Sequence, residues 1–301
     1  MRKILYDLKK NPLLFLFLAP GLVFFLLFKY WPILGLSMAF QEYSPFLGVH
    51  GSPWVGFAQF GRMLSDPDFI QVTVNTMLVG VCYIVFFFPI PVVISILLNE
   101  VLHPGYKRIV QTLVYIPHFI SWVVIYGITY ALLSTDGGAI NNLLSRIGLD
   151  PIPFLASKDW FYPVMILQMI WHEGGWGTII ILAALTSVNP ELYEACAIDG
   201  GNRFHRIRHI VFPAILSTIV ILLLLRLGSF MDIGFEQILM LVNTANRPIA
   251  EVIQTYVYRI GIVQGQFSYT TAVGLFKSAV SIILVLGTNS LIKKFGGEGI
   301  F

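Results

Sequence analysis

Long runs of apolar residues recur along the chain, separated by polar stretches that are rich in glycine and proline. A helix of roughly 20 apolar residues is long enough to cross the hydrocarbon core of a bilayer. We expect about six such spans, near residues 12–40, 70–98, 108–134, 160–188, 212–233 and 269–292. The pattern predicts an all-α polytopic membrane protein that forms one transmembrane domain over residues 1–301.

The composition favours a membrane protein over a soluble one. Of the 301 residues, 56% are hydrophobic and 12% are charged, whereas soluble domains have roughly 45–50% apolar and 25% charged residues. A water-soluble globule of this length would need far more polar side chains to cover its surface. Basic residues precede the first apolar run, but that run lacks a small-residue cleavage site, so we interpret it as a retained span.

The distribution of Lys and Arg predicts the orientation, because cytoplasmic loops of membrane proteins retain positive charge. Basic residues gather at both termini and in the loops near 99–107 and 189–211. The segments 41–69, 134–159 and 234–268 carry a sparser scatter and are expected to face outward. We therefore expect six transmembrane helices with both termini in the cytoplasm.

The largest of the expected cytoplasmic loops, residues 189–213, has the pattern of two short helices joined by a turn. Asn189 is suited to cap the first helix. Gly200 and Gly201 permit a left-handed turn that ends it, and Pro213 is expected to open the next span. The second helix has an apolar face that water does not stabilise, so the loop should dock onto a partner or back onto the spans.

The same loop resembles the EAA loop of binding-protein-dependent ATP-binding cassette (ABC) importers, whose pattern is Glu-Ala-Ala, two residues, Asp-Gly-Ala, and then Ile-x-Leu-Pro. The matching residues are Glu194, Ala195, Asp199, Gly200, Ile210 and Pro213. The sequence departs from the pattern at Cys196, Gly201 and Phe212, which are small changes. Other family-like pieces are Trp54 to Phe57, Asn75-Thr76, and Gly138 to Asn141, so the resemblance covers nearly the whole chain.

The resemblance implies the type I ABC importer permease fold and a coupling loop, residues 189–213, that lies in a groove of a separate ATPase subunit. The residues that it assigns to this coupling are Glu194, Ala195, Asp199, Gly200, Arg203 and Arg206. The alternative is a solvated loop helix that only retains positive charge on the inner side. The sequence has no Gly-x-x-x-x-Gly-Lys-Ser/Thr run, so we expect no enzyme activity of its own and assign ATP and Mg²⁺ to partner ATPase subunits.

Ionisable side chains inside the expected spans are candidates for a ligand site or for internal ion pairs, because burying a charge in a membrane is costly. Alignment through the motifs with maltose-type permeases implies substrate-binding positions at His118, Glu173, Trp176, Arg226 and Phe230. Alternatively, Glu173 and Arg226 neutralise each other and the tryptophans pack. An unpaired Arg226 would favour an acidic sugar, and a paired one would not. Lys277 is interpreted as a packing or snorkelling residue, and Gly174, Gly175 and Gly177 as positions for close helix approach.

The expected function is that of a transmembrane permease subunit that imports a sugar. Segments near 234–237, 256–258 and 269–277 resemble the oligosaccharide and polysaccharide branch of the family. The partners implied are a second homologous permease, two ATPase subunits, an extracellular sugar-binding protein and membrane lipid, without nucleic acid. The resemblance implies a multi-pass protein of the bacterial cytoplasmic (inner) membrane, with no catalytic residue, metal site or cofactor of its own.

Two other functions remain open from the sequence. The first keeps the importer class but changes the cargo to a glycerol-phosphate-like or other small polar solute. The second is a secondary transporter driven by an ion gradient, which would not need the spacing of the EAA loop. A membrane enzyme is disfavoured because the chain has neither a His-Glu-x-x-His metal motif nor a Gly-x-Ser-x-Gly elbow.

Overall fold

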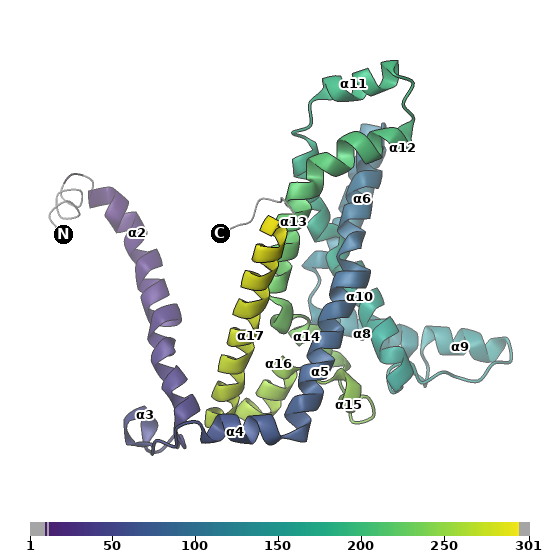
Figure 1. Cartoon of the computed structure of the whole chain (residues 1–301). Helices are drawn as coiled ribbons and strands as arrows, with labels where there is room; N and C mark the ends of the chain where they lie inside the picture. The colour runs from purple at the N-terminus through teal and green to yellow at the C-terminus, as the bar shows by residue number, and fades with distance from the viewer. Residues whose placement is uncertain (1–9, 11, 295–301) are drawn as a thin grey trace. The chain divides into compact units, whose positions relative to one another are not determined.

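The computed structural model describes residue 10 and residues 12–294, and this part of the chain is mainly helical, with turns and loops between the helices. Among the described residues the only strand-like pairing is an isolated bridge between Gln41 and Trp54. The expected all-α architecture is therefore confirmed (Figure 1). The chain divides into two compact units, one formed by Met1–Asp66 with Val257–Phe276 and the other by Pro67–Tyr256 with Lys277–Phe301.

The first unit begins with a long apolar helix. In it α2 (Pro12–Phe25) continues through a π-helical turn, η1 (Leu26–Tyr30), into a 3-10 segment, η2 (Trp31–Phe40). None of the side chains of α2 is buried, which suits a helix surrounded by lipid. The unit also contains α3 (Gly48–Gly51), α4 (Ala58–Ser65), the π-helical η7 (Tyr258–Val263) and the start of α17 (Phe267–Lys294).

Polar contacts join the α4 region to the start of α17 within the first unit. Arg62 donates from Nη2 to Oε1 of Gln266 over 2.7 Å, and its guanidinium lies 4.6 Å from the ring centroid of Tyr269. The Tyr269 hydroxyl donates to Oδ2 of Asp66 over 2.8 Å. These contacts fix α4 beside the first turns of α17.

The second unit contains the remaining helices. They are α5 (Pro67–Cys82), η3 (Tyr83–Phe87), α6 (Pro89–Asn99), α7 (Pro104–Tyr115), η4 (Ile116–Phe119), α8 (Trp122–Leu133), α9 (Ala139–Arg146), α10 (Lys158–Leu185), α11 (Pro190–Ile198), α12 (Arg203–Arg206), η5 (Ile207–Val211), α13 (Phe212–Gly228), η6 (Phe230–Asp232), α14 (Phe235–Leu241), α15 (Arg247–Ala250) and most of α16 (Ile253–Val257), together with the end of α17. Within this unit α10 packs against α6, α7, α13 and α14.

Glycines let α10 approach its neighbours closely. A Cβ at Gly175 would lie 2.1 Å from the carbonyl oxygen of Val114 in α7, so a larger residue does not fit without a backbone shift. A Cβ at Gly177 would lie 3.0 Å from Pro91 in α6, whereas one at Gly174 would make ordinary contacts. The predicted close approach is confirmed at Gly175 and Gly177.

The described residues contain between four and six candidate spans by length and composition. Four are continuous helices, over Pro12–Phe40, Pro67–Asn99, Arg203–Gly228 and Phe267–Ser290. The other two are bent pairs, Pro104–Phe119 with Trp122–Leu133 at 101° and Lys158–Leu185 with Pro190–Ile198 at 77°.

The segment 108–134 differs from the single helix that the hydropathy pattern predicts. α7 ends through η4, residues Ile120 and Ser121 are extended, and α8 begins only at Trp122. Pro117 in η4 has no backbone N–H, which weakens the α-helical ladder at the place where the helix breaks. The break leaves the carbonyl of Ile120 outside any helix.

The cap at Asn189 and the turn at Gly200 are present as expected, but the helix after the turn is longer than expected. Oδ1 of Asn189 accepts the N–H of Glu191 over 3.0 Å, and Gly200 has φ +72°. Pro213 lies in the first turn of α13, but α12 and η5 run into α13 without a break, so one continuous helix covers Arg203–Gly228. The π-helical turn η5 shifts the backbone hydrogen bonds just before Pro213, so the missing N–H is tolerated inside the helix.

We expect Gly175→Ala to destabilise the protein because the added methyl group would overlap the Val114 carbonyl oxygen. Overpacking of this kind costs about 1–3 kcal/mol. The matched control is Gly127→Ala in α8, where a Cβ meets nothing within 4 Å and alanine should add up to about 1 kcal/mol of helix stability. Thermal unfolding of the purified chain in detergent measures both, and equal midpoints for the two variants would contradict the packing described here.

Candidate functional site

The second unit contains a cavity of about 380 Å³ beside the middle of α10. It is lined by Tyr83, Trp122, Met169, Glu173, Arg226, Ser229, Asp232, Ile233, Gly234, Phe235, Glu236 and Gln237. A second cavity, of about 250 Å³, shares Arg226 and Ser229 with the first and also borders Trp176. Three of the five predicted substrate-binding residues, Glu173, Trp176 and Arg226, therefore line one or both cavities.

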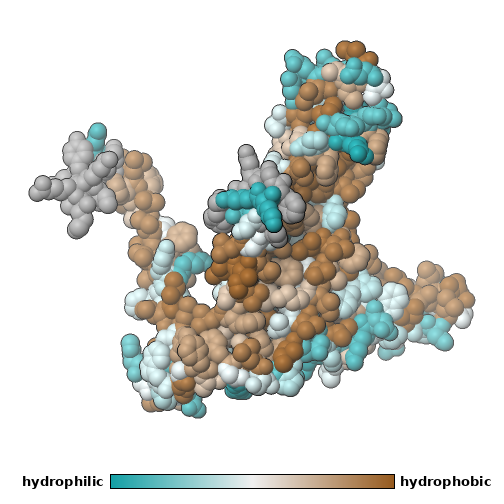
Figure 2. Space-filling view, in the orientation of Figure 1, coloured by the Kyte–Doolittle hydropathy of each residue, from teal (hydrophilic) through white to brown (hydrophobic). Residues whose placement is uncertain are grey.

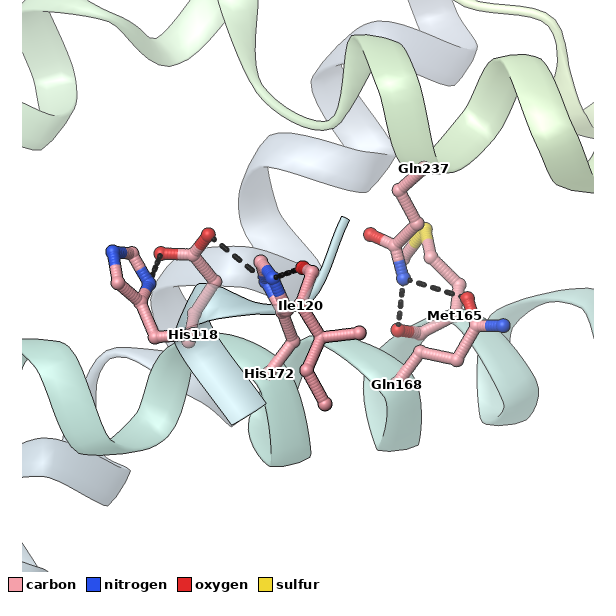
Figure 3. A network of polar contacts seen from close by, with 7 residues as sticks. His118, Ile120, Met165, Gln168, His172 and Gln237 are labelled. Atoms are coloured by element: carbon pink, nitrogen blue, oxygen red, sulfur yellow. Dashed lines mark hydrogen bonds and ion pairs between the residues drawn. The ribbon is translucent and has the colours of Figure 1, made fainter. Parts of the chain in front are cut away.

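Glu173 lies between two histidine rings. Its Oε1 is 3.2 Å from Nδ1 of His172, and its Oε2 is 3.9 Å from Nδ1 of His118 (Figure 3). The His118 ring stacks on Trp176, with centroids 4.5 Å apart and planes 12° from parallel. The structure thus brings His118, Glu173 and Trp176 into one cluster, although they come from η4 and α10.

Arg226 near the end of α13 is not neutralised by Glu173. Its guanidinium carbon lies 5.1 Å from the ring centroid of Tyr83, which is a cation–π distance. Within residues 12–294 no carboxylate lies within 4.0 Å of an Arg226 nitrogen. The alternative in which Glu173 and Arg226 pair with each other is therefore wrong, and the cation faces both cavities.

Phe230 lies apart from the other predicted substrate-binding residues. Its side chain is buried, and a Cβ at Gly80 of α5 would lie 2.3 Å from its ring. It lines neither of the two cavities. In this conformation the Phe230 ring holds η6 against α5 and is covered from the cavity.

A buried amide network holds α14 beside α10 and so shapes one wall of the larger cavity. Nε2 of Gln237 donates to the carbonyl of Met165 over 2.8 Å and to Oε1 of Gln168 over 3.1 Å (Figure 3). Nε2 of Gln168 in turn donates to Oγ1 of Thr129 in α8 over 2.6 Å. Because these groups are away from water, each satisfied hydrogen bond favours this one arrangement of the three helices.

Asp232 at the edge of the larger cavity has two partners. Lys277 of α17 forms an ion pair with its carboxylate, and Gln254 donates a hydrogen bond to it. The interpretation of Lys277 as a packing or snorkelling residue is therefore wrong, because its ammonium group is held by a carboxylate of η6. This pair ties α17 to the cavity rim.

The predicted coupling loop forms the polar end of the second unit. Figure 2 shows hydrophilic side chains gathered over α11 and α12. No residue of α11 is buried, and Ile198 at its end is 86% exposed. A groove of about 400 Å³ lies between α11 and α12 and is lined by Leu192, Ala195, Cys196, Asp199, Gly200, Gly201, His205, His209 and Ile210.

The predicted coupling residues take different positions around this groove. Ala195, Asp199 and Gly200 line it, and Glu194 and Arg203 are exposed beside it. Arg206 is half-buried, and its Nη2 lies 2.5 Å from Oε2 of Glu100, just after α6. The Arg206 guanidinium therefore anchors the base of the loop to α6.

Among the residues not assigned from the sequence are two aromatic residues that line the larger cavity, Tyr83 and Trp122, and His172 beside it. His172 precedes Glu173 on α10, and Trp122 packs on its ring with centroids 4.2 Å apart. Trp122 lies four residues after His118, which the alignment with maltose-type permeases had assigned, so this segment carried a usable signal. Tyr83 lies in an apolar run, and nothing in its neighbours distinguishes it from a packing residue.

Comparison with known proteins identifies the family to which this chain is similar. The family described as "Binding-protein-dependent transport system inner membrane component" matches residues 88–295. The chain is 49% identical over 300 residues to the polygalacturonan/rhamnogalacturonan transport system permease protein YteP of Bacillus subtilis (strain 168), covering 100% of this chain and 94% of that protein. It is also 49% identical over 294 residues to protein LplB of the same organism, covering 98% and 92%.

Solved structures give the same result. A permease chain in the crystal structure of a bacterial alginate ABC transporter, in complex with an alginate pentasaccharide-bound periplasmic protein, matches with a TM-score of 0.89 and 38% identity. The match covers 98% of this chain and 99% of that one. The chain is therefore a multi-pass membrane protein with the type I importer permease fold, and it belongs to the family of inner membrane components of binding-protein-dependent transport systems.

Proposed function

We propose that this chain is one of the two permease subunits of an ABC importer for oligosaccharides that carry carboxylate groups. The observation that carries the proposal is the Arg226 guanidinium, which borders both cavities and has no carboxylate partner within the described residues. The larger cavity is also lined by the carboxylates of Glu173, Asp232 and Glu236. Arg226 is the one cationic residue among the described residues that line either cavity, so its guanidinium is the group that can donate charge-assisted hydrogen bonds to a ligand carboxylate. Relatives named for polygalacturonan and for the acidic polysaccharide alginate agree with such a cargo.

The cavity walls suit a sugar. Tyr83 and Trp122 border the larger cavity, and Trp176 borders the smaller one. Aromatic faces pack against the apolar faces of a sugar ring, while a few polar groups bind its hydroxyls and fix its orientation. Arg226 and Glu173 supply polar groups of opposite sign at this place, and Ser229 adds a hydroxyl.

We infer six spans with both termini in the cytoplasm, each bent helix pair counting as one span. The charge distribution supports this topology, because Arg203, Arg206 and Arg208 lie together at the polar end of the second unit. The coupling loop then faces the cytoplasm, and the membrane is the cytoplasmic (inner) membrane of a bacterium.

We infer that the partners are a second homologous permease, two ATPase subunits and an extracellular sugar-binding protein. The relative solved in complex with its periplasmic protein supports the binding-protein partner. ATP and Mg²⁺ belong to the ATPase subunits, to which α11 docks. Exposed Leu192, Ile198 and Phe204 give the loop an apolar surface for that contact.

One continuous helix connects the coupling loop to the two cavities. Arg203 lies at its beginning and Arg226 in its last turn, and a helix rises 1.5 Å per residue, so the two are about 35 Å apart along the axis. When ATP binding closes the ATPase subunits, movement of α11 and α12 is transmitted along this helix. The motion changes the position of Arg226 and switches the cavity between its outward- and inward-facing states.

Arg226→Gln should reduce uptake of an oligogalacturonide by the assembled importer in proteoliposomes. A charge-assisted hydrogen bond contributes about 1.5–3 kcal/mol, which corresponds to roughly a 10- to 150-fold change in affinity. Arg226→Lys should retain part of the activity because it keeps the charge. Arg146→Gln in the exposed helix α9 is the matched control and should be neutral; unchanged uptake with Arg226→Gln would refute the acidic-sugar proposal.

Gly200→Val should abolish ATP-driven uptake while leaving membrane insertion intact. Valine at φ +72° strains the turn after α11 by about 1–2 kcal/mol, which tilts α11 away from its docking position. The control is Gly148→Val, which has φ +81° and equally open surroundings. The ratio of sugar transported to ATP hydrolysed distinguishes the two, and a normal ratio for Gly200→Val would show that α11 does not couple.

A further inference from the structure

Three potential metal ligands meet at the break between η4 and α8. His118, His172 and Glu173 each offer one ligand atom, and these atoms all lie within 4.8 Å of one another. His172 is 4% exposed, and the other two side chains are about three-quarters buried. Two neutral nitrogen ligands and one carboxylate oxygen are a donor set that binds divalent transition metals.

The hydrogen bond of His172 fixes which of its nitrogens is available. Nε2 lies 2.9 Å from the carbonyl oxygen of Ile120 (Figure 3). A carbonyl only accepts, so Nε2 carries the proton, and in the neutral ring Nδ1 presents a lone pair. Metal-binding histidines are oriented in the same way, by donating their other ring N–H to a carbonyl or carboxylate. The Ile120 carbonyl is available because the helix is broken there.

The two Nδ1 atoms have no hydrogen-bond partner. Nδ1 of His118 and Nδ1 of His172 are both buried, and neither has a hydrogen-bond partner in the described part of the chain. Nδ1 of His172 lies 3.2 Å from Oε1 of Glu173 in a geometry that is not a hydrogen bond. A proton on each Nδ1 would form an ion pair with one Glu173 oxygen, whereas a single metal cation would satisfy both nitrogens and the carboxylate at once.

We propose that His118, His172 and Glu173 bind one divalent transition metal ion, with Zn²⁺ as the best match. Ligands at 2.0–2.1 Å around a tetrahedral zinc ion lie about 3.3 Å from one another. Nδ1 of His172 lies 3.2 Å from Oε1 of Glu173, and Nδ1 of His118 lies 3.9 Å from Oε2. One ligand atom from each residue lies within 4.8 Å of the other two, so side-chain rotations that bring these atoms together by up to about 1.5 Å complete the site. Three protein ligands leave a fourth coordination position.

Apolar rings surround the site on two sides. Trp122 packs on His172 and Trp176 stacks on His118, which holds both imidazoles in place. Glu173 borders the larger cavity, so the fourth position is reached from there by water or by an oxygen of a transported molecule. The site is argued from these side chains alone and does not depend on the proposed cargo.

The test is zinc binding by the full chain, purified in detergent without a polyhistidine tag and stripped with a chelator. Competition against a chromophoric chelator measures the stoichiometry and the affinity, and we expect one bound Zn²⁺ per chain. Glu173→Gln and His118→Phe should each weaken this binding at least tenfold, since changes at groups that only orient ligands already cost roughly 10- to 100-fold. Phenylalanine keeps the stacking on Trp176, so His118→Phe removes the ligand with little change in packing.

The matched control uses the other histidine pair of the chain. The rings of His205 and His209 stack with centroids 6.0 Å apart on an exposed helix, and a pair four residues apart is itself able to bind zinc. His209→Phe should leave the affinity unchanged. The proposal is overturned if the unmodified chain binds no stoichiometric Zn²⁺, or if His209→Phe abolishes binding that Glu173→Gln retains.

Discussion

The cost of placing a polar group in an apolar medium governs the arrangement of this chain. Lipid offers no hydrogen bonds, so each polar side chain within the spans needs a protein partner or a hydrated cavity. Gln168 and Gln237 meet this requirement through a buried network, and Asp232 and Lys277 through an ion pair. Glu173 and Arg226 border a cavity, and Glu173 also lies beside His118 and His172. The polar side chains that border the cavity are the ones that a transported molecule can contact.

The same constraint explains why the helices around the site are broken or closely packed. Gly175 brings α10 against the backbone of α7, which places the α10 histidine and carboxylate next to η4. The extended residues after η4 expose a backbone carbonyl inside the protein, and His172 satisfies it. At the other end, Arg206 and Glu100 fix the base of the coupling loop. The continuous helix from Arg203 links the two ends mechanically.

Much of this architecture followed from local sequence signals. Apolar run length predicted the helices, and the cap at Asn189 and the turn at Gly200 followed from side-chain and backbone chemistry that acts within a few residues. Motif spacing selected His118, Glu173 and Trp176, which the structure places in one cluster; their role in substrate binding stays a prediction. The break at Ile120 and the continuity through Pro213 were not predictable, because proline permits either outcome and tertiary packing decides. The pairing of Lys277 with Asp232 spans 45 residues, and periodicity does not encode such contacts.

The central claim is that the polar side chains of α10 and α13 face a water-accessible path and not lipid. Its most direct test is cysteine accessibility in a chain whose two native cysteines are replaced by alanine. One variant, Ser229→Cys, places a cysteine at a position that lines both cavities. The other, Ile283→Cys, places a cysteine at an exposed apolar position of α17. A charged, membrane-impermeant thiol reagent should label position 229 and leave 283 unmodified in intact membranes. The account would be contradicted if the cysteine at position 283 were labelled and the cysteine at position 229 were not.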